Sequence, residues 1–117
     1  IVAASPEVDV CTLSGGNQQK VLLGKGLATN PRALILDEPS RGVDVKAKRK
    51  IHEAVMALAD RGAAILLISS DLPELVGLSD RVAVMRNGRL IGDMRHDELS
   101  EESVLLAVNG QGALAHA

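Results

Sequence analysis

Residues 34–38 read LILDE, an apolar run that ends in two carboxylates, Asp37 and Glu38. Short apolar runs of this kind, followed here by Pro39, are typical of strands buried inside a sheet. Ligands of open α/β sheets bind at the carboxyl ends of the strands, where these carboxylates stand. Carboxylate oxygens suit a hydrated Mg²⁺ ion, and a second carboxylate can orient a water molecule. The stretch therefore predicts an α/β fold with a cation and water site at the edge of its sheet.

Helix and strand signals alternate on the C-terminal side of this strand. Asp44 can cap a helix that ends at Arg61 and Gly62, a basic residue and a C′ glycine. The apolar residues of that helix recur at helical spacing and share one face: Ile51, Val55, Leu58 and Ala59. A second apolar strand over residues 63–69 follows, and then a short helix that starts at Asp71. The order strand, helix, strand predicts a parallel sheet.

An antiparallel pair of strands follows the parallel part. Residues 81–85 form a strand, and Asn87 and Gly88 connect it to another apolar pair. Both turn residues tolerate positive φ angles, which a tight hairpin requires. A last helix over residues 101–108 starts after Ser100, a good N-cap residue. The sequence thus predicts a C-terminal hairpin followed by a helix.

On the N-terminal side, residues 13–20 read LSGGNQQK and open a helix that runs to about Ala28. Ser14 is a good N-cap, and Gly15 and Gly16 leave the backbone N–H groups open to an anion. The helix dipole favours a phosphate at the same point. A bare Ser-Gly-Gly can also be an ordinary helix entry, but the polar string that follows is unusual for a core helix.

The composition excludes several classes of protein. The 117 residues carry a net charge of −2, which does not favour binding to nucleic acid or to an anionic membrane. The single cysteine cannot form an intrachain disulfide, and no Cys/His cluster has the spacing of metal ligands. With no Phe, Tyr or Trp, the chain offers no aromatic platform for a nucleotide base. Function must therefore come from local sites.

Taken together, these motifs resemble the ATP-binding cassette (ABC) family of ATPases, whose signature motif is Leu-Ser-Gly-Gly-Gln or a close variant. In that family the signature contacts the γ-phosphate of ATP that is held by the opposite cassette of a head-to-tail dimer. The resemblance assigns this contact to Ser14, Gly15 and Gly16, with Gln18 and Lys20 nearby. It implies ATP and Mg²⁺ as cofactors and a second cassette, in the same chain or a dimer, as partner.

The LILDE stretch is similar to the Walker B strand of the same family. This resemblance implies that Asp37 holds Mg²⁺ through water and that Glu38 polarises the attacking water. Asp44 falls in the segment that matches the family's D-loop, which lies along the dimer interface. Asp44 can equally serve as a plain helix N-cap, and the two roles are compatible.

Two departures from the family pattern bear on activity. Ser70 stands where the family usually has a histidine that contacts the γ-phosphate, so that contact is expected to be lost or to need a bridging water. The P-loop pattern G-x-x-x-x-G-K-[ST] does not occur in the chain. The expected organisation is a linker or truncated start over residues 1–12, the C-terminal half of a cassette over 13–110, and a mobile tail over 111–117. The isolated chain is expected to be inactive.

The finer resemblance is to the second cassette of double-cassette importers for ribose, xylose or galactose, on the strings NQQK, EPSRGVD and SSDLPE. It implies a partial P-loop NTPase fold at the cytoplasmic face of the cell membrane. It also implies transmembrane permease subunits as partners and, indirectly, a periplasmic substrate-binding protein. Two alternatives are a non-catalytic dimerisation or regulatory module and the ATPase head of a DNA-maintenance protein. No heptad repeat or basic face supports the second.

Overall fold

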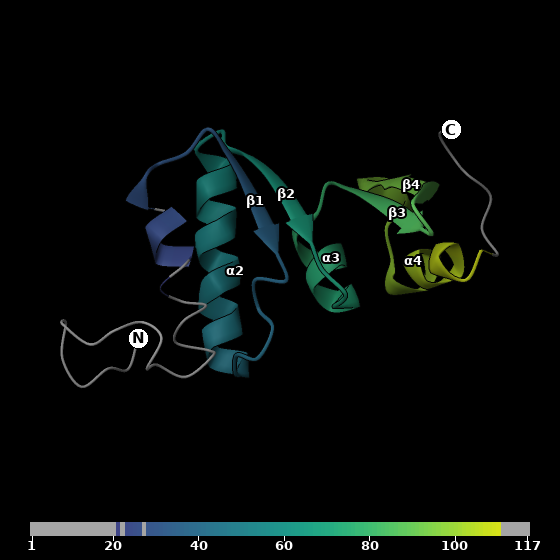
Figure 1. Ribbon diagram of the computed structural model, residues 1–117, viewed down its shortest axis with the longest axis horizontal. Coiled ribbons are helices and arrows are strands. Elements are labelled where there is room, and N and C mark those ends of the chain that lie inside the picture. The colour runs from purple at the N-terminus through teal and green to yellow at the C-terminus, as the bar shows by residue number, and fades with distance from the viewer. Residues whose placement is uncertain (1–20, 22, 27, 111–117) are drawn as a thin grey trace. The chain divides into compact units, whose positions relative to one another are not determined.

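The computed structural model describes residues 21, 23–26 and 28–110 (Figure 1). The chain divides into two compact units, a first unit over residues 1–68 and a second over 69–117, and each is treated by itself. The helix predicted from Ser14 to about Ala28 has six described residues, all of them after residue 20. All six are helical. The predicted linker 1–12 and tail 111–117 lie outside the described residues. No helix within the described part is long and apolar enough to cross a bilayer.

The first unit places one helix against a small parallel sheet. Strand β1 spans Ala33–Asp37, helix α2 spans Val45–Asp60 and strand β2 spans Ala64–Ile68. The two strands are parallel, with Ile35 opposite Leu66. A side-chain oxygen of Asp44 accepts from the backbone N–H of Ala47 at 2.7 Å, which confirms the predicted N-cap. The parallel arrangement that was expected from the element order is also confirmed.

The core of the first unit lies between α2 and one face of its sheet. Leu36 of β1 packs there with Ile51 and Val55 of α2. Ala59 was expected on the same face of α2, but it is exposed, whereas Ala47 is buried. Ala59 lies at the edge of the stripe because eight residues past Ile51 the helix has rotated by about 80° beyond full turns. The apolar pattern thus predicted the buried face of α2 correctly but made it too wide by including Ala59.

The opposite face of this sheet, called the uncovered face below, is exposed within the unit. Side chains alternate along a strand, so Ile35 of β1 and Leu66 and Ile68 of β2 point away from α2. Ile35 keeps 69% and Leu66 58% of its surface accessible. A buried strand was predicted, and the described part of the chain buries only one of its two faces.

The second unit is a hairpin covered by short helices. Helix α3 spans Leu72–Leu78, strands β3 and β4 span Arg81–Arg86 and Arg89–Arg95, the 3₁₀ helix η2 spans His96–Glu98, and helix α4 spans Glu101–Val108. The hairpin turns at Asn87 and Gly88, with φ angles of 51° and 76°. The predicted antiparallel pair is thus confirmed. The capping box of α4 pairs Ser100 with Ser103.

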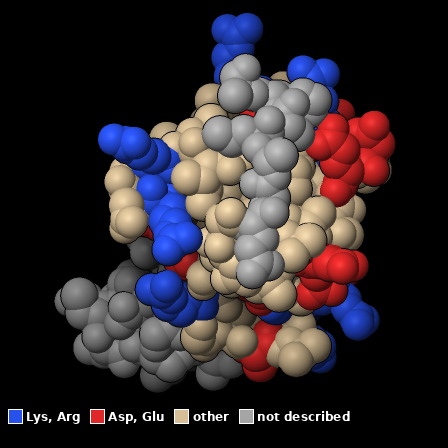
Figure 2. Space-filling view, turned by 90° about the vertical axis from the view of Figure 1, so that its right-hand side faces the viewer, with Lys and Arg blue, Asp and Glu red and all other residues tan. Residues whose placement is uncertain are grey.

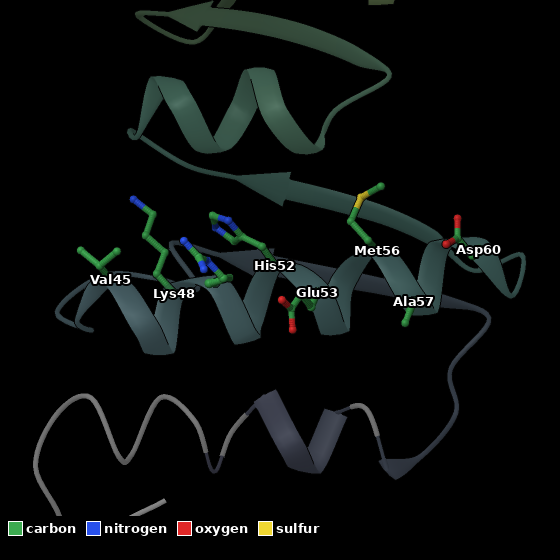
Figure 3. Close-up of a pocket in the computed structure, with 8 residues that line it drawn as sticks. Val45, Lys48, His52, Glu53, Met56, Ala57 and Asp60 are labelled. Atoms are coloured by element: carbon green, nitrogen blue, oxygen red, sulfur yellow. The ribbon is translucent and has the colours of Figure 1, made fainter.

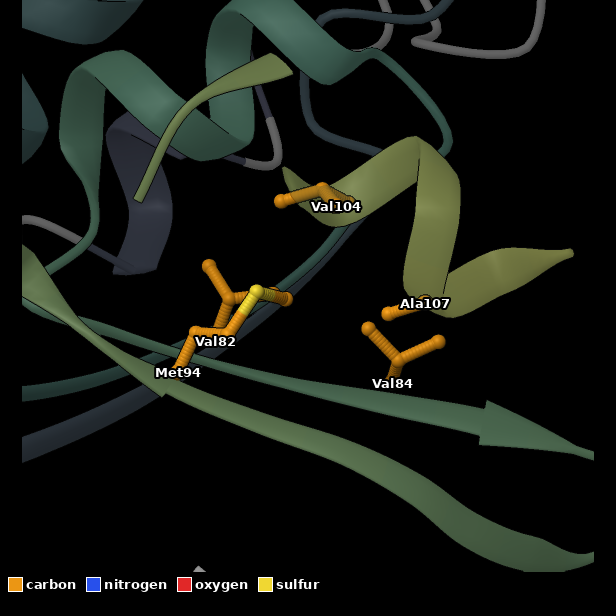
Figure 4. Packing of buried hydrophobic residues seen from close by; sticks show 5 residues of the cluster. All are labelled: Val82, Val84, Met94, Val104 and Ala107. Carbon is orange, nitrogen blue, oxygen red and sulfur yellow. The ribbon is translucent and has the colours of Figure 1, made fainter. Parts of the chain in front are cut away.

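The core of the second unit lies between the hairpin and α4, as Figure 4 shows. Val104 and Ala107 of α4 face Val82, Val84 and Met94 of the strands. Val104 is 1% exposed, which makes it one of the most deeply buried side chains described. Gly92 lies beneath α4, and a Cβ placed there would come within 3.1 Å of the Ala107 methyl group. The absence of a side chain at Gly92 therefore lets the helix approach the strand closely.

The face of the hairpin opposite α4 carries an ion pair, in which Asp93 is only 3% exposed. The guanidinium of Arg81 donates to both carboxylate oxygens of Asp93, at 2.7 and 2.5 Å. The hydrogen bond to Asp93, and then the charge of that carboxylate, raise the pKa of Arg81. In Figure 2, acidic side chains gather mainly at the right of the view, whereas basic side chains lie at the left, at the top and at the lower right. Exposed acidic residues described in the unit occur just before β3, in η2 and in the first turn of α4: Asp80, Asp97, Glu98, Glu101 and Glu102.

Candidate functional site at the end of strand β1

The two predicted carboxylates lie where the parallel sheet of the first unit ends. Asp37 is the last residue of β1, is exposed and stands opposite Ile68 of β2. The backbone N–H of Glu38 donates to the carbonyl oxygen of Ile68 at 2.7 Å. Glu38 has a φ angle of 49°, a left-handed conformation that is uncommon for a residue with a Cβ. The backbone therefore leaves the strand abruptly between the two carboxylates, in a conformation of the kind that clusters at functional sites.

The loop after Glu38 is held by a series of close contacts. The N–H of Arg41 donates to the Glu38 carbonyl at 3.2 Å, and that of Val43 donates to the Ser40 carbonyl at 3.4 Å. Pro39 is buried inside the first turn. Gly42 has a φ angle of 74°, and Val43 packs against the core cluster. The loop is therefore a sequence of tight turns, with the Asp44 cap at its far end.

A third charged residue of this loop was not predicted as part of the site. Nη2 of Arg41 lies 3.5 Å from Oε1 of Glu38, with side-chain exposures of 73% and 21% respectively. The signal in the sequence is the spacing, because an arginine three residues after a glutamate across a proline turn can reach back to it. Residue spacing alone could not establish the contact, since Arg41 could equally have extended into solvent.

The carboxylates fit a Mg²⁺ ion that is shared with a nucleotide. The described residues contain no group of three or more His, Cys, Asp or Glu side chains that could hold a metal by themselves. Mg²⁺ does not require such a group when phosphates are present, since it keeps several waters and binds one or two carboxylates. Asp37 is exposed at the strand end and can supply one such ligand. The donor set therefore suits Mg²⁺ with a phosphate ligand better than a dedicated metal cage.

The other predicted site residues fall in three places. Asp44 caps α2, which accounts for one of its two expected roles. Ser70 is exposed and belongs to the second unit, just before the Asp71 cap of α3. The predicted phosphate contacts of the signature lie outside the described residues: Ser14, Gly15, Gly16 and Gln18. Only Asp37, Glu38 and Asp44 are therefore placed within one described unit.

A hollow of the described surface lies elsewhere. It measures about 600 Å³ and runs along the outer side of α2, where Figure 3 shows Lys48, His52 and Met56 projecting from the same side of the helix. All the residues that line it belong to this one helix. It includes neither Asp37 nor Glu38. We therefore place the candidate site at the end of β1 on chemical grounds, not in the hollow.

Comparison with known sequences gives consistent matches. A family model described as "ABC transporter" matches residues 3–41. The chain is 54% identical over 110 residues to the ribose import ATP-binding protein RbsA of Geobacillus kaustophilus, covering 94% of this chain and 22% of that protein. It is 50% identical over 110 residues to the xylose import ATP-binding protein XylG of Moorella thermoacetica, with the same coverage. The chain thus spans about a fifth of the length of the curated relatives that it matches.

Solved structures agree with the sequence matches. One ATP-binding cassette of an ABC transporter superposes with a TM-score of 0.65 and 31% identity, covering 86% of this chain and 38% of that one. A dimeric cassette in a post-hydrolysis state, bound to ADP and Pi, superposes with a TM-score of 0.67 and 25% identity. That match covers 72% of this chain and 36% of the other. Both matches confirm the predicted α/β cassette fold.

Proposed function

This chain belongs to the ATP-binding cassette ATPases, and we propose that it forms the C-terminal half of a cassette in the ATP-hydrolysing subunit of a monosaccharide importer. The observation that carries the proposal is the pair Asp37 and Glu38 at the end of a parallel strand, with Glu38 in a left-handed conformation. High identity to ribose and xylose import ATP-binding proteins over most of this chain supports the substrate class.

In the proposed mechanism, Asp37 and Glu38 act on the nucleotide of their own cassette. Asp37 would hold Mg²⁺ through water, and the ion supplies charge that neutralises the phosphate oxygens. Glu38 orients a water molecule in line with the γ-phosphate, and its fixed backbone reduces the number of orientations of its carboxylate. The exposed position of Asp37 at the strand end keeps it accessible to a phosphate-bound ion.

The signature residues serve the opposite nucleotide in this proposal. Ser14, Gly15 and Gly16 would donate to the γ-phosphate of ATP held by a second cassette, and Gln18 would lie nearby. Asp44 would lie at the interface of the two cassettes while it caps α2. A known cassette dimer bound to ADP and Pi shows that related folds pair in this state. The other proposed partners are transmembrane permease subunits and a periplasmic substrate-binding protein, with the chain at the cytoplasmic face of the membrane.

Ser70 indicates that this cassette lacks one charged contact to the γ-phosphate of its own ATP. A serine is shorter than histidine and never cationic, so it cannot reproduce a charged contact to the γ-phosphate. This cassette would then hydrolyse its own ATP without the histidine contact, while its signature serves the opposite nucleotide. The 117-residue chain alone is expected to show no ATP turnover.

The test uses the complete protein that contains this segment, with ATP turnover and ATP binding measured separately. Glu38→Gln should lower turnover at least about tenfold with ATP binding retained, because only the water-orienting group is lost. Glu53→Gln, an exposed carboxylate on α2, is the matched control and should behave as wild type. Ser14→Arg should abolish turnover by filling the anion site. Unchanged turnover in both Glu38→Gln and Ser14→Arg would overturn the proposal.

A further inference from the structure

Arg41 is the charged residue of the loop to which the proposed mechanism assigns no role. Its side chain is 73% exposed, yet it lies 3.5 Å from the Glu38 carboxylate rather than extended into solvent. An ion pair with one partner this exposed contributes little to stability, because water screens it. Fold stability alone therefore gives a weak reason for the contact, and a role at the carboxylate is worth testing.

The backbone between the two residues makes the contact directional. The turn that joins them is closed by the hydrogen bond from the Arg41 N–H to the Glu38 carbonyl, and Pro39 inside it is buried. Glu38 is anchored to Ile68 of β2, and Val43 is anchored in the core. The main chain of the segment that carries Arg41 is thus held at both ends. The geometry thus presents a guanidinium to one oxygen of this carboxylate, Oε1.

We propose that Arg41 is a positioning residue, whose guanidinium restricts the rotation of the Glu38 carboxylate and so directs it toward the attacking water. The inference rests on the proposed function of Glu38 and adds a residue to it. A carboxylate on two rotatable side-chain bonds beyond Cβ can turn away from the water, and each misdirected orientation lowers the rate without weakening ATP binding. The positive charge beside Oε1 favours the carboxylate orientations that keep this oxygen near Arg41.

The test measures kcat and KM for ATP in the complete protein that contains this segment. Arg41→Ala should lower kcat about fivefold and change KM less than about twofold, because an exposed contact controls orientation only weakly. Arg41→Lys should recover at least about half of the wild-type kcat, since it keeps the positive charge. Arg61→Ala is the matched control, because Arg61 is an exposed arginine at the end of α2, and it should leave kcat unchanged.

A double-mutant cycle separates this role from a structural one. In a Glu38→Gln background, Arg41→Ala should cause no further loss of turnover, because the carboxylate that it positions is already gone. ATP affinity, measured by calorimetry under non-hydrolysing conditions, should be the same with and without Arg41. Melting temperature should change by no more than it does in Arg61→Ala.

Each contrary result has a defined meaning. If Glu38→Gln lowers turnover at least about tenfold while Arg41→Ala keeps the wild-type kcat, the inference fails and the proposed function stands. A rise in KM with kcat unchanged, or an additive loss in the double variant, also overturns the positioning role. Unchanged turnover in Glu38→Gln overturns the proposed role of Glu38 and the inference with it.

Discussion

The two sheets of the molecule have the same number of strands, but they differ in the side chains on the face that α2 or α4 does not cover. The parallel sheet of the first unit is covered by α2 on one side and exposes Ile35, Leu66 and Ile68 on the other. The hairpin of the second unit is covered by α4 on one side and carries the Arg81–Asp93 pair on the other. Within one hairpin, the two members of a polar pair satisfy each other's hydrogen-bonding groups. A large apolar face is stabilised only when another protein segment covers it. We infer that the first unit depends more on contacts with other protein segments.

The largest expected effect comes from the same substitution in each core. Val55→Ala in the first unit and Val104→Ala in the second each remove two buried methyl groups, which should cost about 2 kcal/mol of stability. Hydrogen exchange of backbone amides should then increase mainly in the unit that carries the change. Equal acceleration in both units by either variant would show that they unfold together and would remove the basis of the comparison.

The second effect concerns the ion pair on the face of the hairpin opposite α4. Asp93→Ala removes the partner of Arg81 and leaves a gap at a buried position, so the melting temperature should fall by about 5 °C. Asp97→Ala is the control, because Asp97 is an exposed carboxylate in the neighbouring 3₁₀ helix. Thermal unfolding followed by circular dichroism measures both. Equal melting temperatures for the two variants would mean that the pair does not stabilise this face.

The third effect concerns the uncovered face of the first unit. The 117-residue chain should associate with itself in solution, because the exposed apolar side chains of β1 and β2 are adjacent. The double variant Ile35→Lys and Leu66→Lys should weaken this association about tenfold, as measured by sedimentation velocity. Val45→Lys, at an exposed apolar residue of α2, should leave it unchanged. A wild-type chain that stays monomeric at all concentrations would contradict the expectation.

The smallest effect tests the hairpin turn against a helix. Gly88 has a φ angle of 76°, so Gly88→Ala should destabilise the second unit by about 1 kcal/mol. Gly77 lies in α3 without a positive φ angle, so Gly77→Ala should be neutral or slightly stabilising. A Cβ at either position would meet no atom within 4 Å, which makes the two a matched pair. If denaturant unfolding shows that both substitutions change the free energy of unfolding in the same direction, backbone conformation is not the deciding factor.

The predictions that depended on neighbouring residues were accurate. The cap at Asp44, the turn at Asn87 and Gly88 and the helix start after Ser100 all lie where the sequence placed them. Each is decided by residues within four positions, through a side-chain hydrogen bond or a backbone preference. The strand over β1 was likewise found from its apolar run, to within one residue of its end.

Features that depend on distant residues were not accessible in this way. Residues 33–36 of β1 are all apolar, so the sequence could not show that Leu36 is buried while Ile35 is exposed. The pairing of Arg81 with Asp93 joins two strands and follows from their register, which no single stretch specifies. The contact of Arg41 with Glu38 is close in sequence, but it required the left-handed turn at Glu38 to be known.

The sequence by itself therefore determined the kinds and order of the elements, the turns between them and the identity of the carboxylates at the end of β1. These features follow from local preferences and from motifs that a few neighbouring residues define. The tertiary structure alone decided which face of each sheet is covered, the direction in which the Glu38 backbone leaves the strand, and which charges meet. Those outcomes arise because packing and strand register join residues far apart in the chain, where local preferences have no influence.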